Sequence, residues 1–98
     1  MLESAITRKI IRWLNSQKHS FFWKVHGGGY GLQGMPDIVG HYRGRFFAFE
    51  VKRPGVGRLS QLQAAMIGRI NLTSPDDRLP LAFVVCSLDE VQDILALL

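Results

Sequence analysis

Apolar residues near the start of the chain recur with the period of a helix. Over residues 3–17, apolar side chains recur at positions i, i+4, i+7 and i+8, with basic side chains between them, and they are Ile6, Ile10, Trp13 and Leu14. This spacing is typical of an amphipathic helix. Such a helix buries one apolar stripe and exposes a basic face.

Three strands are predicted after this helix. Residues 21–26 (FFWKVH) are aromatic and β-branched, which favours a strand. Residues 38–42 and 45–52 flank Arg43-Gly44, and this arrangement predicts an antiparallel hairpin. Pro54 ends the hairpin's second strand because it has no N–H to donate.

The second half of the chain alternates helix and strand. A helix begins at Ser60, a turn-rich stretch covers 71–80, and the apolar run 81–87 (LAFVVCS) is typical of a buried strand. Ser87 and Glu90 have capping-box spacing at the start of a last helix. We therefore expect a single α/β domain over residues 1–98, with order α-β-β-β-α-β-α and a mixed sheet flanked by helices.

Composition restricts the class of protein. The chain has 98 residues, of which 47% are hydrophobic, as suits one compact domain. Its one cysteine, Cys86, excludes a disulfide framework and a cysteine-based zinc site, and we expect it to be a buried thiol. No apolar run is long enough to span a bilayer, and the N-terminal segment is unlike a signal peptide. These features predict a soluble, cytoplasmic protein without a membrane partner.

The net charge of +4 is unevenly distributed. Residues 1–70 carry 11 Lys and Arg against 3 acids, a balance of +8, whereas residues 71–98 carry 1 against 5, a balance of −4. A basic surface attracts polyanions, most commonly nucleic acid. The acids that remain in the basic part are Glu3, Asp37 and Glu50.

A glycine-rich stretch precedes Asp37. Gly29-x-Gly31-x-x-Gly34 has the spacing of a dinucleotide-binding turn, but that motif must open a helix, and here a strand is predicted instead. Two interpretations remain, a surface loop without a specific role and a loop that approaches phosphate. In the second, the amides of Gly29 and Gly31 contact phosphate and Tyr30 stacks on a base or ribose.

The predicted hairpin brings two carboxylates together. If Arg43-Gly44 is a two-residue turn, Asp37 lies directly across from Glu50, with Cβ atoms about 5 Å apart, and Lys52 shares the face of Glu50. Two such carboxylates repel each other unless they share a proton or a cation.

A hard divalent cation resolves this repulsion. Mg²⁺ accepts one or two carboxylates, a backbone carbonyl and waters as ligands, which Asp37, Glu50 and the Val51 carbonyl could supply. Lys52 would then orient a water or stabilise charge developing on a phosphate. The chemistry that this predicts is hydrolysis of a phosphodiester.

Each of these residues also has a purely structural interpretation. Asp37 could cap a turn, Glu50 and Lys52 could form a solvated edge of the hairpin, and Glu3 could be a favourable acid in a helix's first turn. Their combination in a basic segment favours the site.

Basic residues near this pair are candidate contacts to the nucleic-acid backbone. Lys24, Arg53 and Arg58 would give salt-dependent, sequence-independent binding. His26 adjoins the glycine stretch and His41 shares the face of Asp37 and Glu50, so both are candidate phosphate contacts.

Three motifs carry a resemblance to a known family. Gly34-Met-Pro-Asp37, Phe-Glu50-Val-Lys52 and Leu59-Ser60-x-x-Gln63 resemble the PD-(D/E)xK nuclease superfamily and, within it, the VRR-NUC family in its small stand-alone bacterial and phage form. The resemblance extends over the whole chain and implies a restriction-endonuclease-like core. The turn-rich segment 71–80 departs from the shorter connection of relatives.

The resemblance also implies roles for individual residues. Asp37 and Glu50 correspond to metal-binding acids, Lys52 to the catalytic lysine, Gln63 to the active-site glutamine, and Glu3 to a catalytic acid on the first helix that reaches the metal through water. Gln63 has a second interpretation, because Ser60-x-x-Gln63 is also a capping box. The two roles are compatible.

The function implied is that of a Mg²⁺- or Mn²⁺-dependent DNA endonuclease. Small members of the family suggest a homodimer that cuts branched DNA such as four-way (Holliday) junctions, which is an argument by analogy. The alternative is a catalytically silent nucleic-acid-binding module that uses the same basic face.

Overall fold

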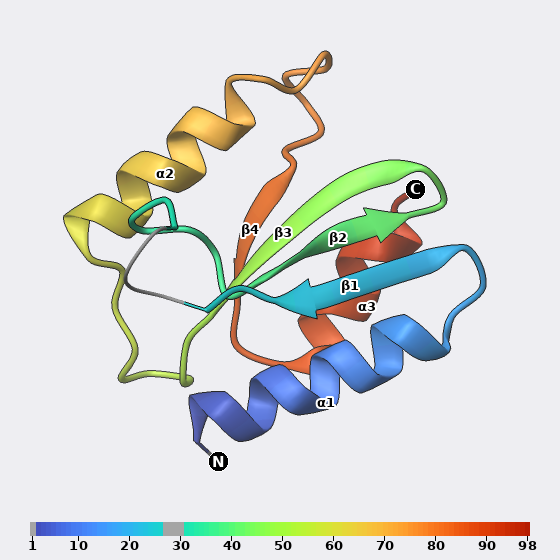
Figure 1. Cartoon of the computed structure of the whole chain (residues 1–98), viewed down its shortest axis with the longest axis horizontal. Helices are drawn as coiled ribbons and strands as arrows, with labels where there is room; N and C mark the ends of the chain where they lie inside the picture. The colour runs from blue at the N-terminus through green and yellow to red at the C-terminus, as the bar shows by residue number, and fades with distance from the viewer. Residues whose placement is uncertain (1, 27–30) are drawn as a thin grey trace.

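Four strands form one mixed sheet in the computed structural model, which describes residues 2–26 and 31–98 (Figure 1). The strands lie in the order β1-β2-β3-β4, antiparallel from β1 to β3 and parallel between β3 and β4. The elements are α1 (Glu3–Ser16), β1 (Ser20–Lys24), β2 (Ile38–Tyr42), β3 (Arg45–Val51), α2 (Gln61–Asn71), β4 (Ala82–Val85) and α3 (Leu88–Ala96). The predicted fold class and element order are confirmed.

The turn between β2 and β3 fixes the register of the sheet. Arg43 and Gly44 have φ angles of 54° and 83°, so both lie in the left-handed region that a two-residue type I′ turn requires. Tyr42 therefore pairs with Arg45, and Ile38 pairs with Phe49 at the far end. This is the register that the sequence predicts.

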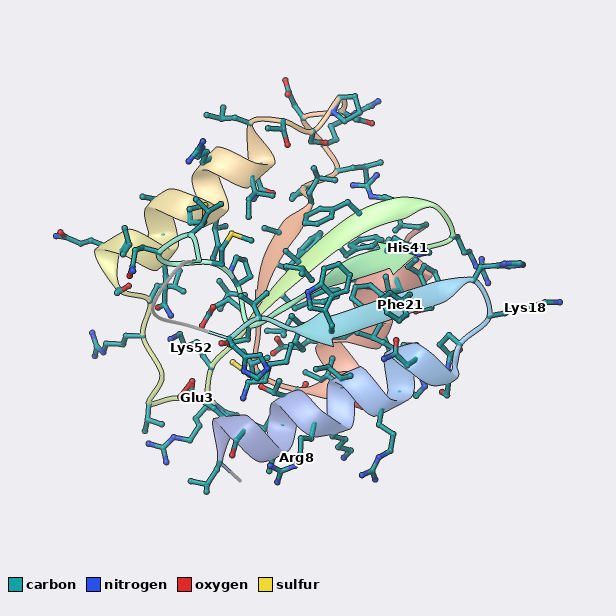
Figure 2. The ribbon with its side chains drawn as sticks, in the orientation of Figure 1. Glu3, Arg8, Lys18, Phe21, His41 and Lys52 are labelled. Carbon is teal, nitrogen blue, oxygen red and sulfur yellow. The ribbon has the colours of Figure 1, made fainter. Side chains whose placement is uncertain are left out.

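One face of the sheet packs on α1 and α3 and contains the larger core (Figure 1). The apolar stripe of α1 is buried as predicted, and Arg8 projects from the helix away from the sheet (Figure 2). The buried side chains of this core are Ile6, Ile10, Leu14, Phe22, Ile38, Phe47, Phe49, Val51, Val85, Val91 and Leu95.

The opposite face is only partly covered, by α2. Ile67 and Ile70 pack on a small cluster of Val39, Ala48 and Ala82, and no residue of α2 is fully buried. The prediction of a buried strand over 81–87 is therefore only partly correct. One face of β4 is buried, but β4 lies at the sheet edge and its Val84, on the face toward α2, is 42% exposed. Cys86 is likewise partly exposed, not buried as expected.

An asparagine side chain closes each edge of the sheet. The amide of Asn15 in α1 donates to the Phe22 carbonyl and accepts from the Phe22 N–H, at 2.9 and 2.8 Å. On the other edge, Asn71 donates to the Ala82 carbonyl at 3.1 Å and accepts from its N–H at 2.8 Å. Each amide satisfies backbone groups that an edge strand otherwise leaves unpaired.

The two predicted capping boxes differ. At α2, the Ser60 hydroxyl accepts from the Gln63 N–H and the Gln63 side chain accepts from the Ser60 N–H, so the box is complete. At α3, Ser87 accepts from the Glu90 N–H, but the Glu90 carboxylate accepts from the N–H of Cys86. The predicted bond from the Ser87 N–H to the Glu90 side chain is therefore wrong, because the N–H of Cys86, one residue earlier, occupies that carboxylate.

Across the described residues, 2–26 and 31–98, no helix has the length and apolar character that a bilayer crossing requires.

Two glycines give opposite predictions for stability. A Cβ at Gly40 would lie 2.1 Å from the Phe21 carbonyl oxygen and 2.6 Å from the Phe22 Cα, so Gly40→Ala should destabilise the fold by at least about 2 kcal/mol. Gly68 lies inside α2 with nothing within 4 Å of its Cβ position, so Gly68→Ala should stabilise by about 0.5–1 kcal/mol. Urea unfolding followed by circular dichroism measures both, and equal effects would contradict the close packing of β1 on β2.

Candidate active site

Asp37 and Glu50 meet where the hairpin opens. Asp37 lies one residue beyond the Ile38–Phe49 pair, across from Glu50. Its Oδ2 accepts a 2.8 Å hydrogen bond from the backbone N–H of Val51. Because N–H and C=O of one strand residue point to the same side, the Val51 carbonyl is expected on the side of β3 that faces β2.

Glu50 is a buried carboxylate in the sheet. Its exposed fraction is 1%, so a solvated hairpin edge is the wrong interpretation of this residue. Its Oε2 accepts from the Gln63 side-chain amide at 3.1 Å and lies 3.3 Å from the Lys52 ammonium nitrogen. Its Oε1 is buried without a hydrogen-bond partner among the described residues.

The surroundings of Glu50 disfavour its charge. Burial first, and then the neighbouring charge of Asp37, raise the pKa of Glu50 from its ordinary 4.5 to about 7, although Lys52 acts in the opposite direction. Near neutral pH, Glu50 is therefore ionised in only part of the molecules, and a bound cation would favour its charged form.

Gln63 caps α2, as its sequence position suggested, and also contacts the carboxylate of Glu50. Its Oε1 accepts from the Ser60 N–H at 2.9 Å, which caps α2, while its Nε2 donates to Glu50. One amide side chain thus attaches the beginning of α2 to the carboxylate in β3. This establishes its contacts, while catalysis by Gln63 stays a prediction.

Lys52 is held against the sheet by the loop that follows it. Its side chain is 13% exposed and points to the Glu50 carboxylate. The Gly57 backbone passes so close that a Cβ there would lie 2.7 Å from the Lys52 Cβ. The sequence reasoning missed Gly57, because only the fold reveals this approach.

Gly34 also acts through close packing. It has a φ of 77°, and a Cβ at this position would lie 2.7 Å from the Leu62 carbonyl oxygen in the first turn of α2. The chain then runs through Met35 and Pro36 into β2, not into a helix. Gly34 therefore lets the segment before Asp37 approach α2, which differs from a glycine's role in a dinucleotide site.

A polar hollow of about 210 Å³ opens beside the carboxylates, lined by Val25, Leu32, Gln33, Gly34, Met35, Asp37 and Gln63. It connects the surface with Asp37 and with the amide that contacts Glu50. A small anionic group and waters have room in a space of this size.

The residues predicted to contact nucleic acid lie at the surface, as far as the structure describes them. Lys24, His26, Gly31, Arg53 and Arg58 are all exposed. Gly31 lies beside His26, since a Cβ on it would be 3.9 Å from the His26 carbonyl oxygen. Predictions for Gly29 and Tyr30 concern residues outside the described ranges. His41 is exposed on the same sheet face as Glu50, near the other end of the strands (Figure 2).

Glu3 does not join the carboxylate pair. It begins α1, at the same end of the molecule as Lys52 in the view of Figure 2. Within residues 2–26 and 31–98, however, no three His, Cys, Asp or Glu side chains gather closely enough to hold a metal directly. A role for Glu3 through water stays a prediction.

The donor set fits a hard divalent cation. Asp37, Glu50 and the Val51 carbonyl offer oxygen ligands. The Oε1 of Glu50, which no described residue bonds, is a buried acceptor that a cation would satisfy. Two carboxylates with a carbonyl and waters suit Mg²⁺ or Mn²⁺ and do not suit a site selective for thiolate-binding metals.

Comparison with known proteins gives one solved structure with this fold. No family model matches the sequence, and no curated protein matches it. A structure described as a "VRR_NUC domain protein" superposes with a TM-score of 0.72 at 16% sequence identity, covering 99% of this chain and 87% of the other. The fold expected from the three motifs thus agrees with an independent comparison of shape, and the chain has the fold of this VRR_NUC domain protein.

Proposed function

We propose that this protein is a divalent-metal-dependent DNA endonuclease, which acts as a homodimer on branched DNA. The observation that carries the proposal is the buried Glu50 carboxylate, which faces Asp37 and contacts Lys52. One of its oxygens has no hydrogen-bond partner within residues 2–26 and 31–98. A protein that only bound DNA would gain nothing from two acids directed at the phosphate backbone. The nuclease-family fold supports the same conclusion.

The chain's own residues divide the work. Asp37, fixed by the Val51 N–H, and Glu50, fixed by Gln63, would hold Mg²⁺ or Mn²⁺. When bound, such a cation supplies Lewis acidity and lowers the pKa of a water ligand. The Lys52 ammonium lies beside the same carboxylate, where it would stabilise negative charge on the scissile phosphate.

The direct test is cleavage of labelled DNA. Four-way junction, splayed and linear duplex substrates are incubated with Mg²⁺, Mn²⁺ or EDTA, and we expect metal-dependent cutting with a preference for branched DNA. Lys52→Ala and Glu50→Gln should each lower the rate at least about 100-fold with native circular dichroism. Metal-independent DNA binding without product from the wild type would instead identify a silent binding module.

A pair of variants separates the two contacts of Gln63. Ser60→Ala removes the capping hydroxyl alone and should cost about 1 kcal/mol in urea unfolding without slowing cleavage. Gln63→Ala also removes the amide that donates to Glu50, so it should slow cleavage as well. Equal cleavage rates for the two variants would restrict Gln63 to its role as a helix cap.

The raised pKa of Glu50 predicts how metal-free stability depends on pH. Since the pKa is higher in the folded state, its stabilising contribution is complete below pH 4.5 and is lost as the pH rises through about 7. Thermal unfolding in EDTA should therefore show a lower Tm at pH 8 than at pH 5.

The Glu50→Gln variant provides the control, because it should lack this component of the pH dependence. Addition of Mg²⁺ should raise the wild-type Tm at pH 8 more than at pH 5, since the charged carboxylate is the ligand. An equal effect of Mg²⁺ on wild type and Glu50→Gln would contradict the assignment of Glu50 as a ligand.

A further inference from the structure

Large aromatic side chains lie exposed on the sheet face that carries Glu50. Phe21 and Trp23 in β1 and Phe46 in β3 are 58%, 48% and 40% exposed. His41 in β2 lies between them, because it pairs with Phe21 on one side and with Phe46 on the other. We call these four residues the aromatic platform.

The platform exists because α2 covers only part of this face. Ile67 and Ile70 pack on Val39, Ala48 and Ala82, and the main contact of α2 with the sheet is at β4, the edge strand opposite β1. Phe21 and Trp23 contact each other instead, with ring centroids 5.7 Å apart. Figure 2 shows Phe21 and His41 on neighbouring strands of this open part of the sheet.

The platform shares a sheet face with the proposed active site, and the buried Ala48, on which α2 packs, lies between the two. Phe46 and Glu50 lie four residues apart on one strand and point to the same face, so their Cα atoms are about 13 Å apart. A DNA strand with its phosphate at Glu50 would place bases a few nucleotides away over these rings.

The surrounding charge suits a polyanion. Between residues 4 and 75, Asp37 and Glu50 are the only acids in the sequence, and both belong to the proposed site. Arg69 lines a hollow of about 310 Å³ next to Phe46, together with Met35, Met66 and Ile70. Cationic side chains near exposed rings are the usual composition of a surface for single-stranded nucleic acid.

Two other occupants fit less well. A partner strand added to the β1 edge would compete with the Asn15 amide for the Phe22 backbone groups. A second copy of the chain seated on the rings would crowd the approach to carboxylates on the same face. Neither conflict arises for unpaired bases.

We propose that the aromatic platform stacks unpaired bases of DNA next to the cleavage site and so selects substrates with a single-stranded region. This inference rests on the proposed nuclease function for its place in catalysis. Aromatic–base stacking depends on ring faces that every base possesses, so recognition would be tolerant of sequence.

The test measures binding without cleavage. Fluorescence anisotropy of labelled oligothymidylate, in EDTA, is compared for wild type, Trp23→Ala and Phe46→Ala. Each variant should bind about tenfold more weakly, while blunt duplex binding stays nearly unchanged. Leu72→Ala is the matched control, because Leu72 is an equally apolar and 87% exposed residue outside the platform, and it should bind like wild type.

An abasic oligonucleotide of the same length distinguishes stacking from charge. Wild type should lose affinity for it, and Trp23→Ala should lose nothing further. The proposal would be overturned if Trp23→Ala lost the same affinity for the abasic oligonucleotide as for oligothymidylate, or if it lost affinity for neither. So would sedimentation showing that Phe46→Ala turns a dimer into a monomer with unchanged oligothymidylate affinity, because the platform would then be a subunit interface.

The two proposals fail separately. Cleavage in Mg²⁺ combined with unchanged oligothymidylate binding by the variants removes the platform and leaves the nuclease. If the variants bind more weakly but the wild type cuts in neither metal, the nuclease proposal fails and the aromatic platform remains.

Discussion

The burial of one carboxylate is the constraint on which the rest of this structure depends. Glu50 is enclosed by the sheet, its neighbour Asp37 has the same charge, and one of its oxygens has no partner among the described residues. The groups that make this tolerable are the Lys52 ammonium and the Gln63 amide. Because that same amide caps α2, which has no fully buried residue of its own, the placement of a whole helix is tied to the state of one acidic side chain.

The two faces of the sheet differ in what covers them and in the side chains that they carry. The face under α1 and α3 is a dry aromatic and aliphatic core, and the acidic end of the sequence, with Asp89, Glu90 and Asp93, forms the helix α3 on that side. The other face carries the carboxylates and receives a single, loosely packed helix. The charges of the chain do not divide in the same way, because the basic helix α1 and the acidic helix α3 lie on one side of the sheet.

Local patterns predicted much of this arrangement. The period of α1 and the two-residue turn at Arg43-Gly44 act over short distances, so the core stripe and the pairing of β2 with β3 could be inferred from sequence. Contacts between distant residues could not. The apolar run of β4 gave no sign that it forms a sheet edge with Val84 exposed. The double contact of Gln63 and the approach of Gly57 to Lys52 appear only when separate segments meet in the fold.

The two asparagines at the sheet edges link the lifetime of the protein to a slow covalent change. Asparagine is among the chemically labile residues, since its amide can hydrolyse to a carboxylate. At Asn15 or Asn71, that change would replace a donating NH₂ by an acceptor oxygen opposite the carbonyl of Phe22 or Ala82. An attractive contact would become a repulsive one, on β1 in the first case and on β4 in the second. Such a change would therefore loosen the outermost strands and leave the contacts of the buried core in place.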